Sequence, residues 1–375
     1  MRRGSNAAVA AAALVALLAA LAGDSSPCAA RGLTASDVEI GTAPAAEVLA
    51  LWKDGAMTDP AKRRRAVVRI GTSAPYRMLR EFQGGQNRCV ISDDDFARAL
   101  LYPDSGSCGL SFYQAREGRA SIDSLVREVA RRVPALRGQI AAQVSRYLPD
   151  ANDWKPIRIW FVVSSRWSFD AMTRRWDDPG EGDEPIVLVN ATDVMEYGNS
   201  TEERMAALEH VLAHESFHAA LWQIQGSLPG WDGYRSETPP PFVYIARVVL
   251  DEGVAHYIDW RTRPGSDTLF VAKPGPRETH AFSQLALACK RIRERTGDFG
   301  SRMEVLQLAS TGPLWSKYGA ISGMFAAYRI ESKLGVDSLR AAVQGGPPAF
   351  FRIYRGLAAA DTTLKGVPDD LAPQR

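Results

Sequence analysis

The chain has 375 residues, of which 46% are apolar, and its formal charge at pH 7 is +2. This length favours one large domain or two closely packed ones, and the apolar fraction is typical of a soluble globular protein. Charges of both signs are distributed along the chain without a long run of one sign, which argues against a nucleic-acid-binding arm or an acidic tail, so we expect no nucleic-acid partner.

Residues 1–30 have the order of a secretory signal peptide. Arg2 and Arg3 precede an apolar stretch at 7–22, which small and polar residues follow, and the stretch is short for a membrane span. An uncleaved N-terminal anchor is the alternative, whereas the polar residues before Cys28 disfavour lipid attachment there. We expect an exported, periplasmic or extracellular protein that has no stable membrane span after signal removal.

The other cysteines take their meaning from that compartment. Cys89 and Cys108 bracket a stretch rich in Gly, Asp and Ser, and they are the natural disulfide pair in an oxidising environment. Cys289 lies in an apolar helical context, which favours a buried thiol. Because the chain contains no Cys-x-x-Cys pair, a zinc site built from thiolates is not expected.

Residues 31–150 are predicted to form a helical N-terminal region, with helices at 77–83, 94–101 and 121–147. In the last of these, apolar residues recur at helical intervals, and Pro134 is expected to kink or split the helix.

A second region is predicted at 151–360, before a short C-terminal tail at 361–375. It begins with two runs of β-branched and aromatic residues at 157–165 and 185–192, which predict two strands joined by a turn-rich loop. Helices are then expected at 200–225, 242–260, 278–295 and 319–334. Ser200 and Glu203 form a capping box at the start of the first, and Gly226 ends it.

The helix at 200–225 contains the sequence HESFH, which places His214 and His218 one turn apart with Glu215 beside them. Random placement would produce this pattern somewhere in the chain with a probability of roughly 0.003, for a motif that has a stated mechanism. Residues four apart share a helix face, so both imidazoles can point at one ion. This pattern predicts a zinc site.

A catalytic zinc ion needs a third protein ligand and an open position for water. The helix at 242–260 offers Glu252, which lies 34 residues after His218 in a segment expected to return alongside the first helix. Gly253 next to it allows close approach at the ligand.

His-Glu-x-x-His with a downstream Glu-Gly-x-Ala-x-Tyr resembles the gluzincin clan of zinc metallopeptidases, which includes thermolysin-like and aminopeptidase-like enzymes. More narrowly, residues from about 155 to 355 are similar to a bacterial family of exported proteins described as zinc-dependent peptidases, whose substrates are unknown. The resemblance implies an α+β, mostly helical fold: a zincin-like catalytic domain with a small β-sheet, an active-site helix and a helical C-terminal part. It also implies that the edge strand of this sheet holds extended substrate by main-chain hydrogen bonds.

In this pattern His214, His218 and Glu252 are the zinc ligands and Glu215 is the general base. Tyr318, in WSKYGAISGMF, matches a tyrosine that stabilises the oxyanion in these enzymes, although a core aromatic is an equal alternative.

The chain departs from the thermolysin-like pattern four residues after Glu252, where it has His256 instead of an aspartate. His256 can touch substrate, orient a ligand, or replace Glu252 as the third ligand. Asp251 and Asp259 are candidates for orienting a histidine, or else solvated helix residues.

Two further histidines have simpler interpretations. His210, one turn before the ligand pair, is expected at the helix surface or beside a ligand, because a fourth protein ligand would close the catalytic position. His280 is expected to be a surface residue.

Together these features predict a zinc metallopeptidase that acts on peptides or proteins, in which a metal-activated water attacks the peptide bond and Glu215 takes its proton. Two alternatives remain. One is a non-catalytic zinc-binding or partner-binding envelope protein, which would not need Glu215. The other is a zinc hydrolase of a non-peptide amide.

Overall fold

The computed structural model of the protein describes residues 30–53, 59–166, 169–178, 182–236, 238–294 and 299–371. Most of these residues are helical, and four strands form one small sheet, as expected for a mostly helical α+β fold. The expected signal peptide lies outside the described residues except for residue 30. No helix in the described part of the chain is both long enough and apolar enough to cross a membrane.

The sheet contains β1 (Val38–Gly41), β2 (Ile157–Val162), β3 (Ala171–Asp178) and β4 (Gly182–Asn190) in the order β1-β2-β4-β3. The first three strands in this order are parallel, and β3 runs antiparallel to β4 at the edge. The strands predicted from the apolar runs are β2 and β4. β1 and β3 were not predicted, because β1 has only four residues and β3 carries several charged side chains.

The N-terminal region is helical, as predicted. Its helices are α2 (Ala43–Leu51), α3 (Pro60–Thr72), α4 (Ala74–Asn87), α5 (Asp93–Leu101), α6 (Tyr113–Glu117) and α7 (Arg119–Ser145). α7 is not split at Pro134 but continues through it as one helix. The predicted Cys89–Cys108 disulfide is present, with the two Cα atoms 6.1 Å apart, and Cys289 is a buried free thiol.

The C-terminal half is built from helices that follow the predicted order. They are α8 (Ala191–Val194), α9 (Thr201–Ile224), α10 (Pro241–Trp260), α11 (Ser266–Leu269), α12 (Pro276–Glu294), α13 (Phe299–Gln307), α14 (Tyr318–Leu334), α15 (Val336–Gln344) and α16 (Gly346–Ala360). The short 3-10 turn η6 (Leu314–Ser316) precedes α14.

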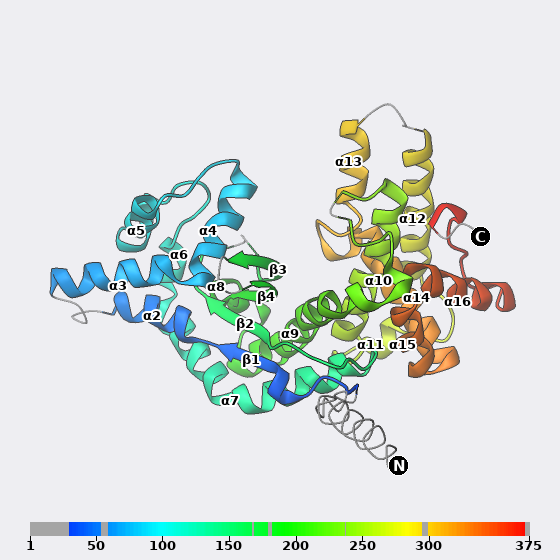
Figure 1. The fold of residues 1–375 in the computed structure, drawn as a ribbon, viewed down its shortest axis with the longest axis horizontal. Coiled ribbons are helices and arrows are strands. Elements are labelled where there is room, and N and C mark those ends of the chain that lie inside the picture. The colour runs from blue at the N-terminus through cyan, green and yellow to red at the C-terminus, as the bar shows by residue number, and fades with distance from the viewer. Residues whose placement is uncertain are drawn as a thin grey trace, which may run out of the picture.

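The helix α9 links the two halves of the molecule. It contacts β3, β4 and α7 as well as α10. Figure 1 shows α2 to α7 gathered around the sheet, α10 to α16 gathered on the other side, and α9 passing between them. Because β1 belongs to the N-terminal region and pairs with β2, the expected division near residue 150 runs through a shared sheet.

Helices α10 and α14 pack unusually closely, through a pair of glycines. A Cβ atom on Gly323 would lie 1.7 Å from the carbonyl oxygen of Val249, and one on Gly253 would lie 2.5 Å from the backbone of Gly323. These distances are far below van der Waals contact, so only glycine fits at either position. The contact fixes α10 at the residue next to Glu252.

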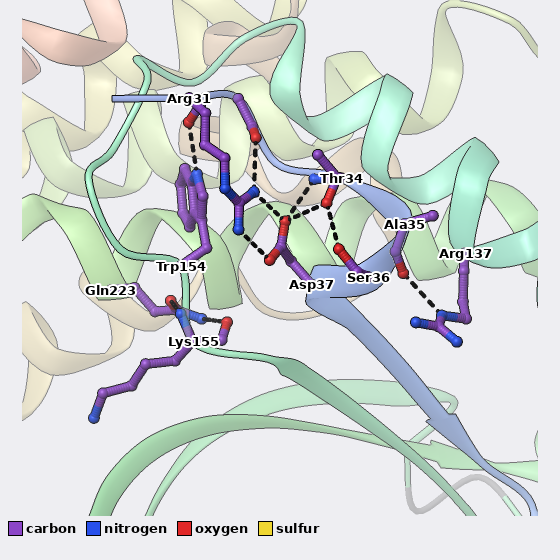
Figure 2. Close-up of polar contacts among 10 residues, drawn as sticks. Arg31, Thr34, Ala35, Ser36, Asp37, Arg137, Trp154, Lys155 and Gln223 are labelled. Atoms are coloured by element: carbon purple, nitrogen blue, oxygen red, sulfur yellow. Dashed lines mark hydrogen bonds and ion pairs between the residues drawn. The ribbon is translucent and has the colours of Figure 1, made fainter. Parts of the chain in front are cut away.

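Hydrogen bonds hold the first described residues in place immediately before the sheet, as Figure 2 shows. Arg31 donates to both carboxylate oxygens of Asp37, at 2.5 and 2.7 Å, and Thr34 donates to the same carboxylate through its backbone N–H and its hydroxyl. The indole N–H of Trp154 donates to the carbonyl oxygen of Arg31. These bonds hold the turn η1 (Ala35–Asp37) immediately before β1.

Candidate metal centre and its cavity

Helix α9 presents the HESFH residues because its local sequence sets where it begins and which face it buries. Ser200 and Glu203 form the predicted capping box, in which the Ser200 hydroxyl accepts from the Glu203 backbone N–H. His214 and His218 are both buried and lie one turn apart on the same helix face. The centroids of their rings are 4.9 Å apart.

Helix α10 brings Glu252 to this pair, as the sequence predicts. The Nε2 atoms of His214 and His218 are 3.2 Å apart, and Oε2 of Glu252 lies 3.8 and 3.7 Å from them. Tetrahedral ligands at about 2.1 Å from a zinc ion lie about 3.4 Å from one another. The three atoms therefore have the spacing that one zinc ion requires.

Each of the two buried imidazoles has a polar partner at Nδ1. His218 Nδ1 lies 2.7 Å from Oδ1 of Asp251, and His214 Nδ1 lies 3.0 Å from Nδ1 of His256. With Nδ1 occupied in this way, each ring directs Nε2 towards Glu252, which is how a partner behind a histidine fixes the tautomer that binds metal. Asp251 and His256 thus contact the two histidines as orienting groups.

A second group of potential ligands overlaps the first. His214, His256 and Asp259 each offer one ligand atom, and these three atoms also lie within 4.8 Å of one another. In this group, however, Oδ1 of Asp259 already accepts two hydrogen bonds from Arg263, at 2.9 and 2.5 Å. The group of His214, His218 and Glu252 is therefore the better metal site.

The charges of the protein groups at this site favour a bound cation. Burial raises the pKa of Glu252 and lowers the pKa of His214 well below its ordinary value. Burial also acts to lower the pKa of His218, but the carboxylates of Asp251, Glu252 and Glu215 outweigh it and raise that pKa to about 10. A divalent cation can replace the proton that these carboxylates hold on His218.

Glu215 lies beside the three ligands but is held by a different element. The Thr173 hydroxyl on β3 lies 2.7 Å from Oε2 of Glu215 and 2.8 Å from its backbone carbonyl oxygen, so its single proton serves one acceptor at a time. Burial raises the pKa of Glu215 to about 6, against opposing effects of His218 and the Thr173 hydrogen bond. A carboxylate with a pKa in this range suits general acid–base catalysis near neutral pH.

The three ligands and Glu215 line a cavity of about 780 Å³. Residues 170–174, at the start of β3, form part of its wall, and aromatic side chains such as Phe82, Trp222 and Trp260 form other parts. In the described sheet, β3 has β4 on one side and no strand on the other. The candidate metal site therefore lies beside both a cavity and an edge strand.

The other predicted site residues lie elsewhere. The hydroxyl of Tyr318 donates to the carbonyl oxygen of Val305 at 2.8 Å, and its ring lines a separate cavity of about 290 Å³, so the structure does not bring Tyr318 to the ligands. His210 is half-buried with Nδ1 3.4 Å from the Thr262 hydroxyl, outside both ligand groups. His280 is exposed, as predicted.

Thr173 is the site residue that the sequence analysis missed. The segment containing it was read as part of a loop, so no side chain in it was placed near the motif. The segment offered little signal, because the three polar residues 173–175 between Met172 and Trp176 break the apolar–polar alternation that is typical of a half-buried strand.

A two-histidine motif on a buried helix, a glutamate from a second helix and a further carboxylate beside them form a group that could hold a metal ion. The chain belongs to the family described as "Putative zinc dependent peptidase (DUF5700)", whose model matches residues 78–363. The match extends into the N-terminal region and covers more than half of the chain. No curated protein and no solved structure was found to match the chain.

Proposed function

We propose that the protein is a gluzincin-like zinc metallopeptidase in which His214, His218 and Glu252 hold the metal and Glu215 is the general base. The convergence of the three ligand atoms, 3.2 to 3.8 Å apart, beside a carboxylate that no ligand role requires is the observation that carries this proposal. A merely metal-binding protein would not need Glu215 in that place.

When bound, zinc polarises the scissile carbonyl and lowers the pKa of water. Glu215 takes the proton of the attacking water and passes it to the leaving amine nitrogen, which converts the amide into a carboxylate and an amine. Thr173 holds the Glu215 carboxylate in place through its hydroxyl. The open edge of β3 supports an extended substrate backbone by main-chain hydrogen bonds.

We also propose that the protein is exported and acts in the periplasm or outside the cell. The order of residues in the first 30 positions supports this, and so does the Cys89–Cys108 disulfide, because disulfides persist mainly in oxidising compartments. Fractionation of cells, with N-terminal sequencing of the mature chain, tests the proposal. A cytosolic protein that retains Met1 would contradict it.

The peptidase proposal is tested by two glutamate variants with opposite expectations. Glu215→Gln removes the base and leaves the three ligands, so zinc content should stay near one per chain while hydrolysis falls roughly 10² to 10⁴-fold. Glu252→Gln removes an anionic ligand, so zinc affinity and hydrolysis should fall together. Zinc is measured by elemental analysis, and hydrolysis by mass spectrometry of a proteome-derived peptide library.

The same library separates the alternatives. Stoichiometric zinc without cleavage of any peptide would favour a non-catalytic binding protein, and cleavage of acylated small amides alone would favour a non-peptide amidohydrolase. If Glu215→Gln lost its zinc or remained fully active, the assignment of Glu215 as the base would be wrong.

A further inference from the structure

Lys317 lies between η6 and α14, directly before the tyrosine that was expected at the active site. Its side chain is half-buried and lines the same cavity as the three ligands and Glu215, whereas Tyr318 lines the separate cavity between α12 and α13. Two neighbouring residues thus point to opposite sides of this junction. The one that faces the ligands is a lysine.

Three of the five acidic groups that line the cavity, its aspartates, have hydrogen-bond partners within the protein. Asp251 lies 2.7 Å from His218, Asp259 accepts from Arg263, and Asp170 accepts from the Tyr197 hydroxyl at 3.0 Å. In the described part of the chain, no carboxylate or carbonyl oxygen accepts a hydrogen bond from the Lys317 ammonium group. This half-buried cation is therefore available to a negatively charged group that enters the cavity.

Lys317 and the three ligands line one cavity, together with Glu215. Arg263 also lines this cavity, but its charge is paired with Asp259. A substrate bound in the cavity at the ligands therefore also meets the ammonium group of Lys317.

We propose that Lys317 binds the scissile carbonyl oxygen of the substrate and stabilises the negative charge that develops on it during hydrolysis. This inference rests on the proposed peptidase function. The role is the one for which the sequence analysis considered Tyr318, whose hydroxyl is engaged by the Val305 carbonyl on the other side of the junction.

The chemical step assigns Lys317 no proton transfer. Water adds to the carbonyl carbon while the electron pair of the C=O bond moves onto the oxygen, where the ammonium group donates a hydrogen bond. Glu215 takes the proton of the water and delivers it to the nitrogen, the C–N bond breaks, and the carbonyl re-forms. Lys317 stays protonated throughout, so its contribution is electrostatic stabilisation of the negative charge on the oxygen.

Lys317→Met tests this role, because methionine is also unbranched but carries no charge. We expect full zinc content, a KM close to that of the wild type and a kcat lower by roughly 10² to 10³-fold, as for the loss of one oxyanion donor. Lys317→Arg keeps the cation and should recover part of the rate. Lys333→Met is the matched control, since Lys333 lies near the other end of α14 and makes only a 3.9 Å surface pair with Asp361.

A binding measurement tests the same role without turnover. The phosphinic and the hydroxyethylene analogues of one tetrapeptide differ in charge at the position of the reacting carbonyl. Calorimetry on the zinc-loaded protein should show that Lys317→Met weakens the anionic phosphinic analogue by at least tenfold more than the neutral one. Lys333→Met should leave both dissociation constants unchanged.

Two results would overturn the inference. One is a loss confined to KM and to peptides with an acidic residue, which would make Lys317 a binding site for a substrate carboxylate. The other is an unchanged kcat together with unchanged affinity for the phosphinic analogue. Absence of peptide hydrolysis by the wild type would count against the peptidase function alone, because the two analogues still decide whether Lys317 binds the anion.

Discussion

The two edge strands of the sheet have different surroundings. β1 has four residues, and the turn before it is fastened by the hydrogen bonds between Arg31, Thr34 and Asp37. β3 has eight residues, and its first part lines the cavity beside the ligands, where Thr173 contacts Glu215. The β1 edge therefore contributes mainly to stability, whereas the β3 edge lies beside the candidate metal site. Changes on the cavity side should alter zinc binding or catalysis, and changes near β1 should alter only stability.

The largest effect on the cavity side is expected from loss of a ligand. His218→Ala removes one of three protein ligands, so the purified protein should lose most of its zinc and its hydrolytic activity. His210→Ala is the control, because His210 belongs to the same helix but lies outside both ligand groups, and it should retain one zinc per chain. Elemental analysis decides between them. Stoichiometric zinc in His218→Ala would exclude the ligand set proposed here.

A smaller effect on zinc is expected from Asp251→Asn. The asparagine side-chain oxygen can still accept a hydrogen bond from Nδ1 of His218, but the negative charge of the carboxylate is lost. Zinc affinity should therefore fall roughly 10 to 100-fold. Competition with a chromogenic chelator measures this change. Asp259→Asn is the matched comparison on the same helix and should change the affinity little. The reverse result would favour the ligand group of His214, His256 and Asp259.

At the cavity edge itself, Thr173→Val keeps the shape of the side chain and removes its hydroxyl. Glu215 then loses a hydrogen bond worth about 1.5 kcal/mol, so kcat should fall about tenfold while zinc content stays the same. Steady-state kinetics on one cleaved peptide gives the answer. Thr192→Val is the control, because the buried Thr192 hydroxyl has no hydrogen-bond partner in the described structure. A kcat for Thr173→Val equal to that of the wild type would show that β3 does not contribute to catalysis through this hydroxyl.

At the opposite edge, Asp37→Asn should reduce stability and leave zinc and activity unchanged. The hydrogen bond from Arg31 lowers the pKa of Asp37 from 3.8 to about 2, and hydrogen bonds from Thr34 act in the same direction. Burial opposes this change but is outweighed. Because the folded-state pKa is the lower one, this stabilisation is present above pH 4 and is lost as the pH falls from about 4 to 2. Since Arg31 is partly exposed, we expect a loss of about 1 to 2 kcal/mol at pH 7.

Urea unfolding at pH 7 and at pH 3 measures that difference, which should be smaller at the lower pH. Glu39→Gln, on β1, is the control, because its 3.7 Å contact with Arg158 is an exposed ion pair of the kind that contributes little. Equal effects of Asp37→Asn at both pH values would show that the carboxylate charge does not matter.

The site helices could be predicted from sequence because their signals are local. A capping box begins α9, apolar residues at helical spacing bury one face, and a four-residue separation brings His214 and His218 together by helix geometry alone. The export signal and the Cys89–Cys108 pair also rest on short stretches of sequence. For α9 and the disulfide the prediction is confirmed, whereas the export signal lies outside the described residues and stays a prediction.

Tertiary structure decided the contacts between elements. Whether Thr173 reaches Glu215 depends on β3 joining the sheet next to β4, and nothing in its own charged sequence determines that pairing. Whether Lys317 or Tyr318 lines the cavity of the ligands depends on how α14 docks, and the Gly253–Gly323 contact with α10 sets that position. By itself the sequence determined which residues can bind a metal and on which helix face they lie, because helix geometry is local. Only the packing of α9, α10, α14 and β3 decided which carboxylates and cations lie around the candidate ligands, because side chains far apart in the chain meet only in the folded core.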